Sequence, residues 1–365
     1  MTTTDAVAAF RATEPRDPNR PSYTTAYASL LDTVKDAGLL KRRVPFYALL
    51  FSGLVLALGG LCAGFFLLGA SWFQLIIAAA LGIVLTQFAF MAHEAAHRQV
   101  LVTGKANDGV GRAIGTFVVG IRYEWWMSKH TRHHGNPNRI GKDPDIDTDT
   151  ISFYEEAAEG KKGFGRWLTT HQGSLFFPLL MLEGVNLHMR SVSSLIEKRP
   201  VRGRKTELIG IGVRFALYFT VVFWFLPIGL AFAFLGVQLA VFGFYMGASF
   251  APNHKGMPIV SKDAKLDFFS RQVVTSRNIS GGWRSSALLG GLNYQVEHHL
   301  FPNMPRPNLG RARRIVRKEC AALGVPYTET TLMKSYGIIV RYLNKVGIAA
   351  RDPFLCPVYA AYRIH

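Results

Sequence analysis

Acidic residues and cysteine are both scarce in this sequence of 365 residues. Lysine and arginine total 42, whereas aspartate and glutamate total only 24, so the formal net charge is +18. We expect an excess of this sign to attract anionic lipid, an acidic redox protein or a phosphate-bearing substrate head. No nucleic-acid recognition motif accompanies the charge, and we therefore expect no nucleic acid among the partners.

The three cysteines, Cys62, Cys320 and Cys356, lie far apart in the sequence. This distribution predicts neither a disulfide nor a thiolate metal site. Internal repeats and low-complexity runs are also absent. The first 40 residues lack the apolar segment of a cleavable signal peptide, so we expect the first membrane-crossing helix to direct insertion.

Long apolar runs are abundant by contrast. Hydrophobic residues make up 49% of the chain, and the mean hydropathy is +0.15. Four runs approach the ~20 residues with which a helix crosses a bilayer; they are residues 46–69, 72–92, 208–227 and 229–250. Because almost nothing separates the first run from the second, or the third from the fourth, we predict two transmembrane hairpins.

Basic residues flank these runs on one side of the predicted membrane. They are Lys41, Arg42 and Arg43 before the first run, Arg98 and Lys105 after the second, and Arg202, Arg204 and Lys205 before the third. By the positive-inside rule these segments are cytoplasmic. Segments 93–205 and 251–310 and both termini are therefore predicted on the cytoplasmic side of a multi-pass protein, which we expect in a bacterial cell membrane.

Eight of the eleven histidines are concentrated in four short motifs. They are His93 and His97 in HEAAH, His130, His133 and His134 in HTRHH, His254 in PNHKG, and His298 and His299 in QVEHH. Residues three or four apart share a face of a helix, so we expect each box to present its imidazoles in one direction. Gln295 extends the last motif with the same spacing.

This many imidazoles exceeds the needs of one metal ion, which takes about four to six donors. We therefore predict two metals, and the spacing leaves iron, zinc and copper open. Each motif follows a predicted crossing or lies in a cytoplasmic segment, so the ligands gather at the membrane edge. A metal transporter or sensor would place them near mid-membrane, whereas this position favours an enzyme whose substrate has its head in water and its tail in lipid.

The predicted fold is an all-α integral membrane protein with four transmembrane helices in two hairpins and a cytoplasmic helical cap that holds the two-metal centre. We divide the chain into a cytoplasmic N-terminal segment at 1–45, a membrane domain at 46–310 and a basic cytoplasmic C-terminal segment at 311–365.

Several polar residues near the motifs have two open interpretations. Glu94 and Glu297, inside the boxes, could orient a histidine ligand or simply be solvated. Asn253 is a possible ligand or ligand-orienting group beside His254. His188 could lie near the metal or the substrate head, or could be an interfacial polar residue. The aspartates from 143 to 149 lack the glycine and terminal glutamate of a calcium loop, so we interpret them as loop or ligand-orienting residues.

The motifs HEAAH, KHTRHHGNPNRIGKDPDID and NYQVEHHLFPNMPRPNL resemble the three histidine boxes of the membrane fatty acid desaturases. The glutamine at the head of the third box, Gln295, resembles the front-end subgroup. The resemblance extends from the first predicted crossing to about residue 310.

The resemblance implies two iron ions, molecular oxygen and two electrons from an external donor, with a cis double bond formed in an acyl-CoA or an acyl-lipid. It also implies that the eight clustered histidines are the metal ligands, with no catalytic side chain beyond them. Gln295 would be either a weak ligand or a residue that orients one. Neither the residue pattern nor the resemblance identifies the substrate-binding residues.

A fused haem domain with its HPGG signature, common among front-end desaturases, has no counterpart in the sequence. We therefore expect a separate ferredoxin or cytochrome, with its reductase, as the electron donor. The nearest alternative function is a di-iron hydroxylase of alkanes, sterols or carotenoids.

Overall fold

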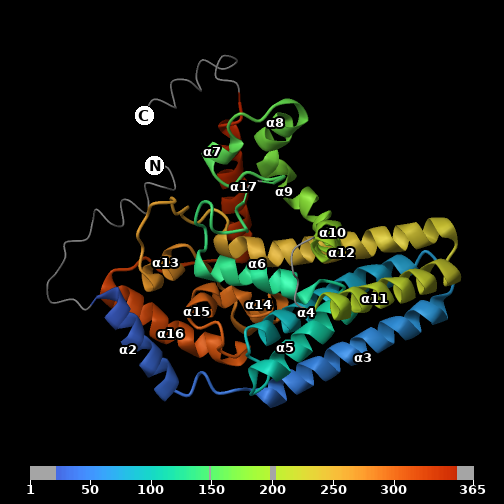
Figure 1. The fold of residues 1–365 in the computed structure, drawn as a ribbon, viewed down its shortest axis with the longest axis horizontal. Helices are drawn as coiled ribbons and strands as arrows, with labels where there is room; N and C mark the ends of the chain where they lie inside the picture. Colours follow the sequence, from blue (N-terminus) through green and yellow to red (C-terminus); the bar gives the residue numbers. More distant parts are fainter. Residues whose placement is uncertain (1–21, 148, 198–202, 352–365) are drawn as a thin grey trace.

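The computed structural model describes residues 22–147, 149–197 and 203–351. Cys356 and Arg202, which were part of the sequence-based expectations, lie outside the described residues. Within these ranges the chain is mostly helical (Figure 1). The two short strands β1 (Arg277–Ile279) and β2 (Thr328–Thr330) pair in parallel, with Arg277 opposite Thr328.

Four helices are long and apolar enough to cross a membrane, as the four runs predict. They are α3 (Val44–Leu68), α4 (Gln74–Ala96), α11 (Arg204–Phe225) and α12 (Ile228–His254). They form the elongated bundle of Figure 1. Two of them continue past the predicted ends of their apolar runs, α12 through Pro252. His93 and His254 consequently lie in the last turns of α4 and α12 instead of after them.

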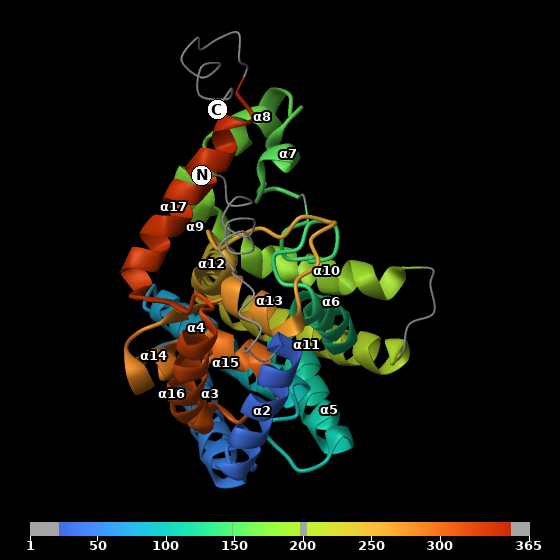
Figure 2. The same cartoon turned by 90° about the vertical axis from the view of Figure 1, so that its left-hand side faces the viewer.

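The remaining helices lie on and around one end of this bundle (Figures 1 and 2). Those before the third long helix are α2 (Tyr23–Asp36), α5 (Gly104–Arg112), the π-helix η1 (Ala113–Val119), α6 (Tyr123–Gly135), α7 (Glu155–Ala158), α8 (Gly163–Thr170), α9 (Gln172–Leu180) and α10 (Glu183–Ile196). Those after the fourth are α13 (Phe268–Val274), α14 (Gly282–Leu288), the short 3₁₀ helix η2 (Leu292–Tyr294), α15 (Gln295–Leu300), α16 (Arg306–Leu323) and α17 (Leu332–Ile348).

Helices α2, α13, α15 and α16 enclose a core of their own, which includes Leu30, Phe269, Leu300 and Val316. A second core joins α4, η1 and α12 through Phe88, Val119 and Phe242. Burial of apolar surface on both sides therefore holds α15, which carries the third histidine box, and α4, which carries the first, in fixed positions.

Helices α10 and α12 cross at backbone contact distance. A Cβ atom at Gly184 would clash with the carbonyl oxygen of Leu239, and one at Gly243 would clash with the backbone nitrogen of Gly184. Glycine is needed at these positions because any side chain would force the two helices apart.

We expect Gly243→Ala to destabilise the protein, because its methyl group has no space at this crossing. Gly236→Ala is the matched control: it lies in the same helix, a Cβ atom there would have no neighbour within 4 Å, and alanine favours a helix over glycine by about 1 kcal/mol. Thermal unfolding in detergent should show a lower Tm for Gly243→Ala only. Equal Tm values for the two variants would contradict the close crossing.

Candidate metal centre

The eight histidines of the four motifs come together in the interior, as the sequence predicts. They divide into a five-histidine group and a three-histidine group, and the candidate ligand atoms within each group lie within 4.8 Å of one another. The five-histidine group contains His93, His97, His130, His134 and His298. The three-histidine group contains His133, His254 and His299.

The expectation that each box points its imidazoles in one direction is wrong for two of the boxes. On α6, His130 and His134 are four residues apart and join the five-histidine group, whereas His133 joins the other. The neighbours His298 and His299 on α15 likewise separate. Adjacent residues on an α-helix are about 100° apart, so one helix can supply both groups from neighbouring positions.

In the three-histidine group, each ring is held by a hydrogen bond at Nδ1. The Nδ1 of His254 donates to the carbonyl oxygen of Thr275 (2.9 Å). The Nδ1 of His299 donates to Oε1 of Gln272 (2.8 Å), and that of His133 donates to Asp143 (3.0 Å). These acceptors place the ring proton on Nδ1 and leave the lone pair on Nε2.

The three Nε2 atoms then face one another. His254 Nε2 lies 3.3 Å from that of His133 and 3.1 Å from that of His299. When all three rings are neutral these lone pairs repel, and a shared cation would turn this repulsion into coordination. The donor set therefore fits a metal ion.

The five-histidine group shows the same deficit of hydrogen-bond donors and acceptors. His130 Nε2 lies 2.8 Å from His97 Nε2 and 3.0 Å from His93 Nε2. Both ring nitrogens of His134 and the Nε2 of His298 are buried without a partner. A buried polar atom without a partner costs about 1–3 kcal/mol, and a bound metal ion would give these buried nitrogens a partner, so this group also fits a metal ion.

Electrostatics keeps most of these rings neutral, the form that binds metal. Burial lowers the pKa of His97 to about 3, and burial likewise lowers the pKa values of His130, His134 and His298. His133 differs: burial alone would lower its pKa, but the carboxylates of Asp143 and Asp145 raise it. Asp143 thus holds the ring of His133 and increases its basicity, as the interpretation of the 143–149 loop predicts.

Gln295 lies at the edge of the three-histidine group. Its Nε2 is 2.8 Å from Nε2 of His254, and its Oε1 accepts a hydrogen bond from Nδ2 of Asn253 (3.1 Å). The side-chain oxygen of Asn253 is buried without a partner. The amide of Gln295 therefore occupies the same space as the ligand nitrogens, with Asn253 one contact further out.

The two glutamates of the boxes are neither solvated nor bonded to a histidine in the described structure. Glu94 is 2% exposed and forms an ion pair with Arg306, whose Nε donates to Oε1 at 2.7 Å; Tyr47 donates to the same oxygen. Glu297 is fully buried and accepts from Asn278 and Tyr327, and burial raises its pKa to about 7. Both carboxylates connect the histidine-bearing helices to neighbouring elements.

The structure places His188 outside both groups. Its Nδ1 donates to the carbonyl oxygen of Gly120, and its ring stacks on Phe242. His171 is exposed on the loop after α8.

Trp126 is one of the two tryptophans before the second box, and it stacks directly on the ring of His130, with centroids 4.3 Å apart.

Several residues that position the site carry no signal in the sequence. Gln272 holds His299 and also donates to the carbonyl oxygen of His134. The buried guanidinium of Arg277 donates to the carbonyl oxygens of Pro252 and Lys255, so it caps the end of α12 that carries His254. Neither residue belongs to a recognisable motif, because each acts through a tertiary contact.

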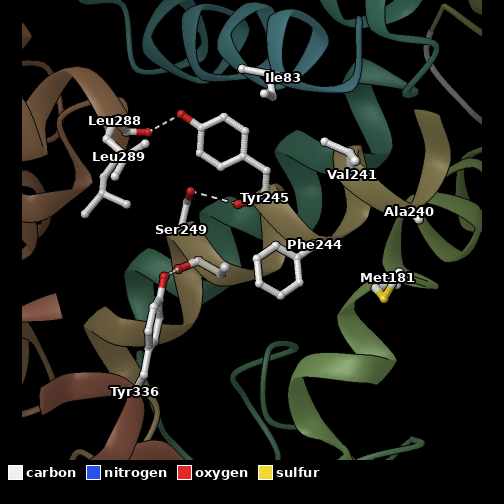
Figure 3. A pocket seen from close by; sticks show the side chains of 11 residues that line it. Ile83, Met181, Ala240, Val241, Phe244, Tyr245, Ser249, Leu288, Leu289 and Tyr336 are labelled. Atoms are coloured by element: carbon white, nitrogen blue, oxygen red, sulfur yellow. Dashed lines mark hydrogen bonds between the residues drawn. The ribbon is translucent and has the colours of Figure 1, made fainter. Parts of the chain in front are cut away.

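A narrow apolar cavity reaches the five-histidine group. Its volume is about 40 Å³, and its lining includes His93, Trp126, Leu187, Met246 and Phe250. A larger pocket of about 480 Å³ lies on a neighbouring face of α12 (Figure 3). The hydroxyls in this larger pocket bond within it, since Tyr245 donates to the carbonyl oxygen of Leu288 and Tyr336 to that of Ala248. Of these two cavities of the described residues, the smaller one contacts a histidine of the two groups and the larger one does not.

A family model described as fatty acid desaturase matches residues 70–331 of this chain. The Delta(8)-fatty-acid desaturase of Helianthus annuus is 26% identical over 351 residues, which cover 89% of this chain and 74% of that protein. Delta(8)-fatty-acid desaturase 2 of Arabidopsis thaliana is 28% identical over 92% of this chain and 78% of its own length. The acyl-lipid (9-3)-desaturase of Borago officinalis is 28% identical over 74% of this chain and 63% of its own length.

We expect Asp143→Asn to weaken metal binding by about 10–100-fold, because the neutral amide no longer raises the basicity of His133. Asp149→Asn is the matched control, since Asp149 pairs with Arg190 in an exposed position. Metal content after dialysis against a graded series of chelator concentrations measures the effect. Identical retention by the two variants would show that Asp143 does not support a metal ligand.

Proposed function

Because this chain belongs to the fatty acid desaturase family, we propose that it forms a cis double bond in a fatty acyl chain at a pair of histidine-bound iron ions. The observation that carries the proposal is the convergence of eight imidazoles in two groups, with Nε2 lone pairs facing one another in the three-histidine group. Chelation by neutral nitrogen donors suits iron, and an unactivated C–H bond requires a metal oxidant, because acids, bases and nucleophiles do not attack it.

The electron balance of this reaction requires a further partner. Conversion of a CH₂–CH₂ unit to CH=CH supplies two electrons, whereas reduction of O₂ to two water molecules takes four. Two electrons and two protons must therefore come from outside the substrate. We propose a separate ferredoxin or cytochrome, with its reductase, as their source.

The side chains of this protein would hold the substrate and exclude water. The reacting segment of the acyl chain would lie at the narrow cavity beside His93, where Leu187, Met246 and Phe250 present apolar surface. Trp126 contributes to the same cavity and covers one face of His130. Iron held by the histidines would supply the oxidant, and these apolar walls would keep bulk water from it.

We also propose the membrane arrangement in which α3 with α4, and α11 with α12, are hairpins whose metal-bearing ends face the cytoplasm of a bacterial cell. The flanking lysines and arginines support this orientation. Residues 46–310 would form the membrane domain. The other helices would cap it, so an acyl-CoA or an acyl-lipid would present its polar head at the membrane surface while its tail enters the bundle.

The first test is mass spectrometry of total acyl chains from cells that express the protein with an electron carrier and its reductase. We expect a product two mass units lighter than its precursor, abolished in His134→Ala together with iron binding. His171→Ala should keep full activity because His171 lies outside both groups, and Glu94→Ala should reduce activity without abolishing it. Undiminished product in His134→Ala would contradict the ligand assignment, and a product 16 mass units heavier than its precursor would indicate a hydroxylase.

We further propose that Gln295 supplies an oxygen ligand to the three-histidine group, whereas the sequence alone slightly favours a role in orienting a ligand. The oxygen and nitrogen of each side-chain amide can exchange positions by a 180° rotation of the amide group. In Gln295 this rotation would bring Oε1 toward His254. If Asn253 rotates as well, its Oδ1 accepts a hydrogen bond from the amide nitrogen of Gln295.

Replacement of this residue tests the role directly. We expect Gln295→Leu to lose about one of two iron ions per chain, because only three donors remain at that group, and Gln295→Glu to keep both. Iron analysis of the purified variants decides the matter. Two ions per chain in Gln295→Leu would exclude Gln295 as a required ligand.

A further inference from the structure

A polar pocket that shares no lining residue with the acyl cavity lies near the two strands, between α16 and α17. Its volume is about 450 Å³. Arg317 and Lys334 project charge into it, and hydroxyl groups of Ser280, Thr330 and Thr331 complete much of its lining. We call it the basic pocket.

Positive charge in the basic pocket is not compensated. Arg317 and Lys334 are exposed, and neither forms an ion pair among the residues that the structure describes. The one carboxylate in the lining, Glu329, is held by the guanidinium of Arg313 at 2.6–2.7 Å. An uncompensated cationic surface is suited to an acidic protein partner.

The basic pocket connects to the metal-bearing helix by one short chain of contacts. Tyr327 lines the pocket, and its hydroxyl donates to Oε1 of Glu297 at 2.8 Å. Asn278 donates to the other oxygen of Glu297 and accepts from the backbone nitrogen of Val296. Glu297 is joined by a peptide bond to His298 of the five-histidine group. A molecule in the basic pocket is therefore one side chain away from the helix that carries His298 and His299.

We propose that the basic pocket is the docking site of the acidic one-electron carrier that the proposed function requires. The carrier is oxidised by one electron at each docking, the metal centre is reduced by one, and two dockings supply each double bond. The route through Tyr327 and α15 delivers the electrons at the ligand histidines, and the weak, small interface typical of such partners allows rapid exchange.

The elements around the two sites argue against a phosphate-bearing substrate head as the occupant. The acyl cavity is lined by α4, η1, α6, α10 and α12, whereas the basic pocket is lined by α16, α17, β2 and the residues that adjoin the two strands. No element contributes to both. A substrate whose tail lies beside His93 thus uses a different set of elements from those that present Arg317 and Lys334.

The test measures binding of a plant-type ferredoxin with a two-iron, two-sulfur cluster to the full, iron-loaded protein in phosphatidylcholine nanodiscs. This neutral lipid removes competition from anionic headgroups. We expect salt-sensitive binding that weakens by about tenfold or more in the double variant Arg317→Glu, Lys334→Glu, and is retained in Arg317→Lys, Lys334→Arg. The matched control is Lys162→Glu, Arg166→Glu, which makes the same charge change at α8, distant from α16 in both views (Figures 1 and 2).

Product formation, measured in the same preparations, distinguishes failure of this proposal from failure of the proposed function. A protein that forms no double bond with any carrier would contradict the function. Two outcomes would overturn the docking site alone, provided that the protein forms the double bond. One is equal ferredoxin binding by wild type and the charge-reversed variant, and the other is wild-type binding that does not depend on salt. A raised KM for acyl-CoA in that variant, with ferredoxin binding unchanged, would assign the basic pocket to the substrate head and also overturn it.

Discussion

The repulsion among eight buried, mostly neutral imidazoles is the constraint on which the rest of the structure depends. Nε2 atoms of different rings lie about as close as hydrogen-bonded atoms, yet the hydrogen bonds at Nδ1 leave no proton between those of the three-histidine group. Cations in both groups would relieve this repulsion. The hydrogen-bond partners of these rings must therefore be rigid, because the imidazoles would otherwise move apart.

The supports come from every part of the chain. Asp143 follows α6, Gln272 lies on α13, and the carbonyl oxygen of Thr275 follows α13 directly. The pair of Glu94 with Arg306 connects the first box to α16, and removal of one member of such a buried pair leaves an uncompensated charge that typically costs about 3–5 kcal/mol. Glycine at the crossing of α10 and α12 lets the helices that line the acyl cavity approach closely.

The cavity beside His93 and the basic pocket have opposite character. The narrow cavity at His93 is apolar and enclosed by membrane and interfacial helices, whereas the basic pocket is polar and formed by the last helices of the chain. In the proposed function, separation of this kind would keep the acyl chain and the electron supply from competing for one entrance. The larger apolar pocket on α12 (Figure 3) contacts neither histidine group, and the hydroxyls of Tyr245 and Tyr336 in it are already hydrogen-bonded.

The sequence by itself determined the four long apolar helices and the eight histidines that meet, because helix length and local spacing are properties of neighbouring residues. Only the tertiary structure decided which histidine joins which group, since adjacent positions on α6 and α15 point to different partners. It also decided that Glu94 and Glu297 are buried structural groups, and that Gln272 and Arg277 support the site. These roles depend on contacts between distant segments, such as Glu94 with Arg306, and no local pattern encodes such a contact.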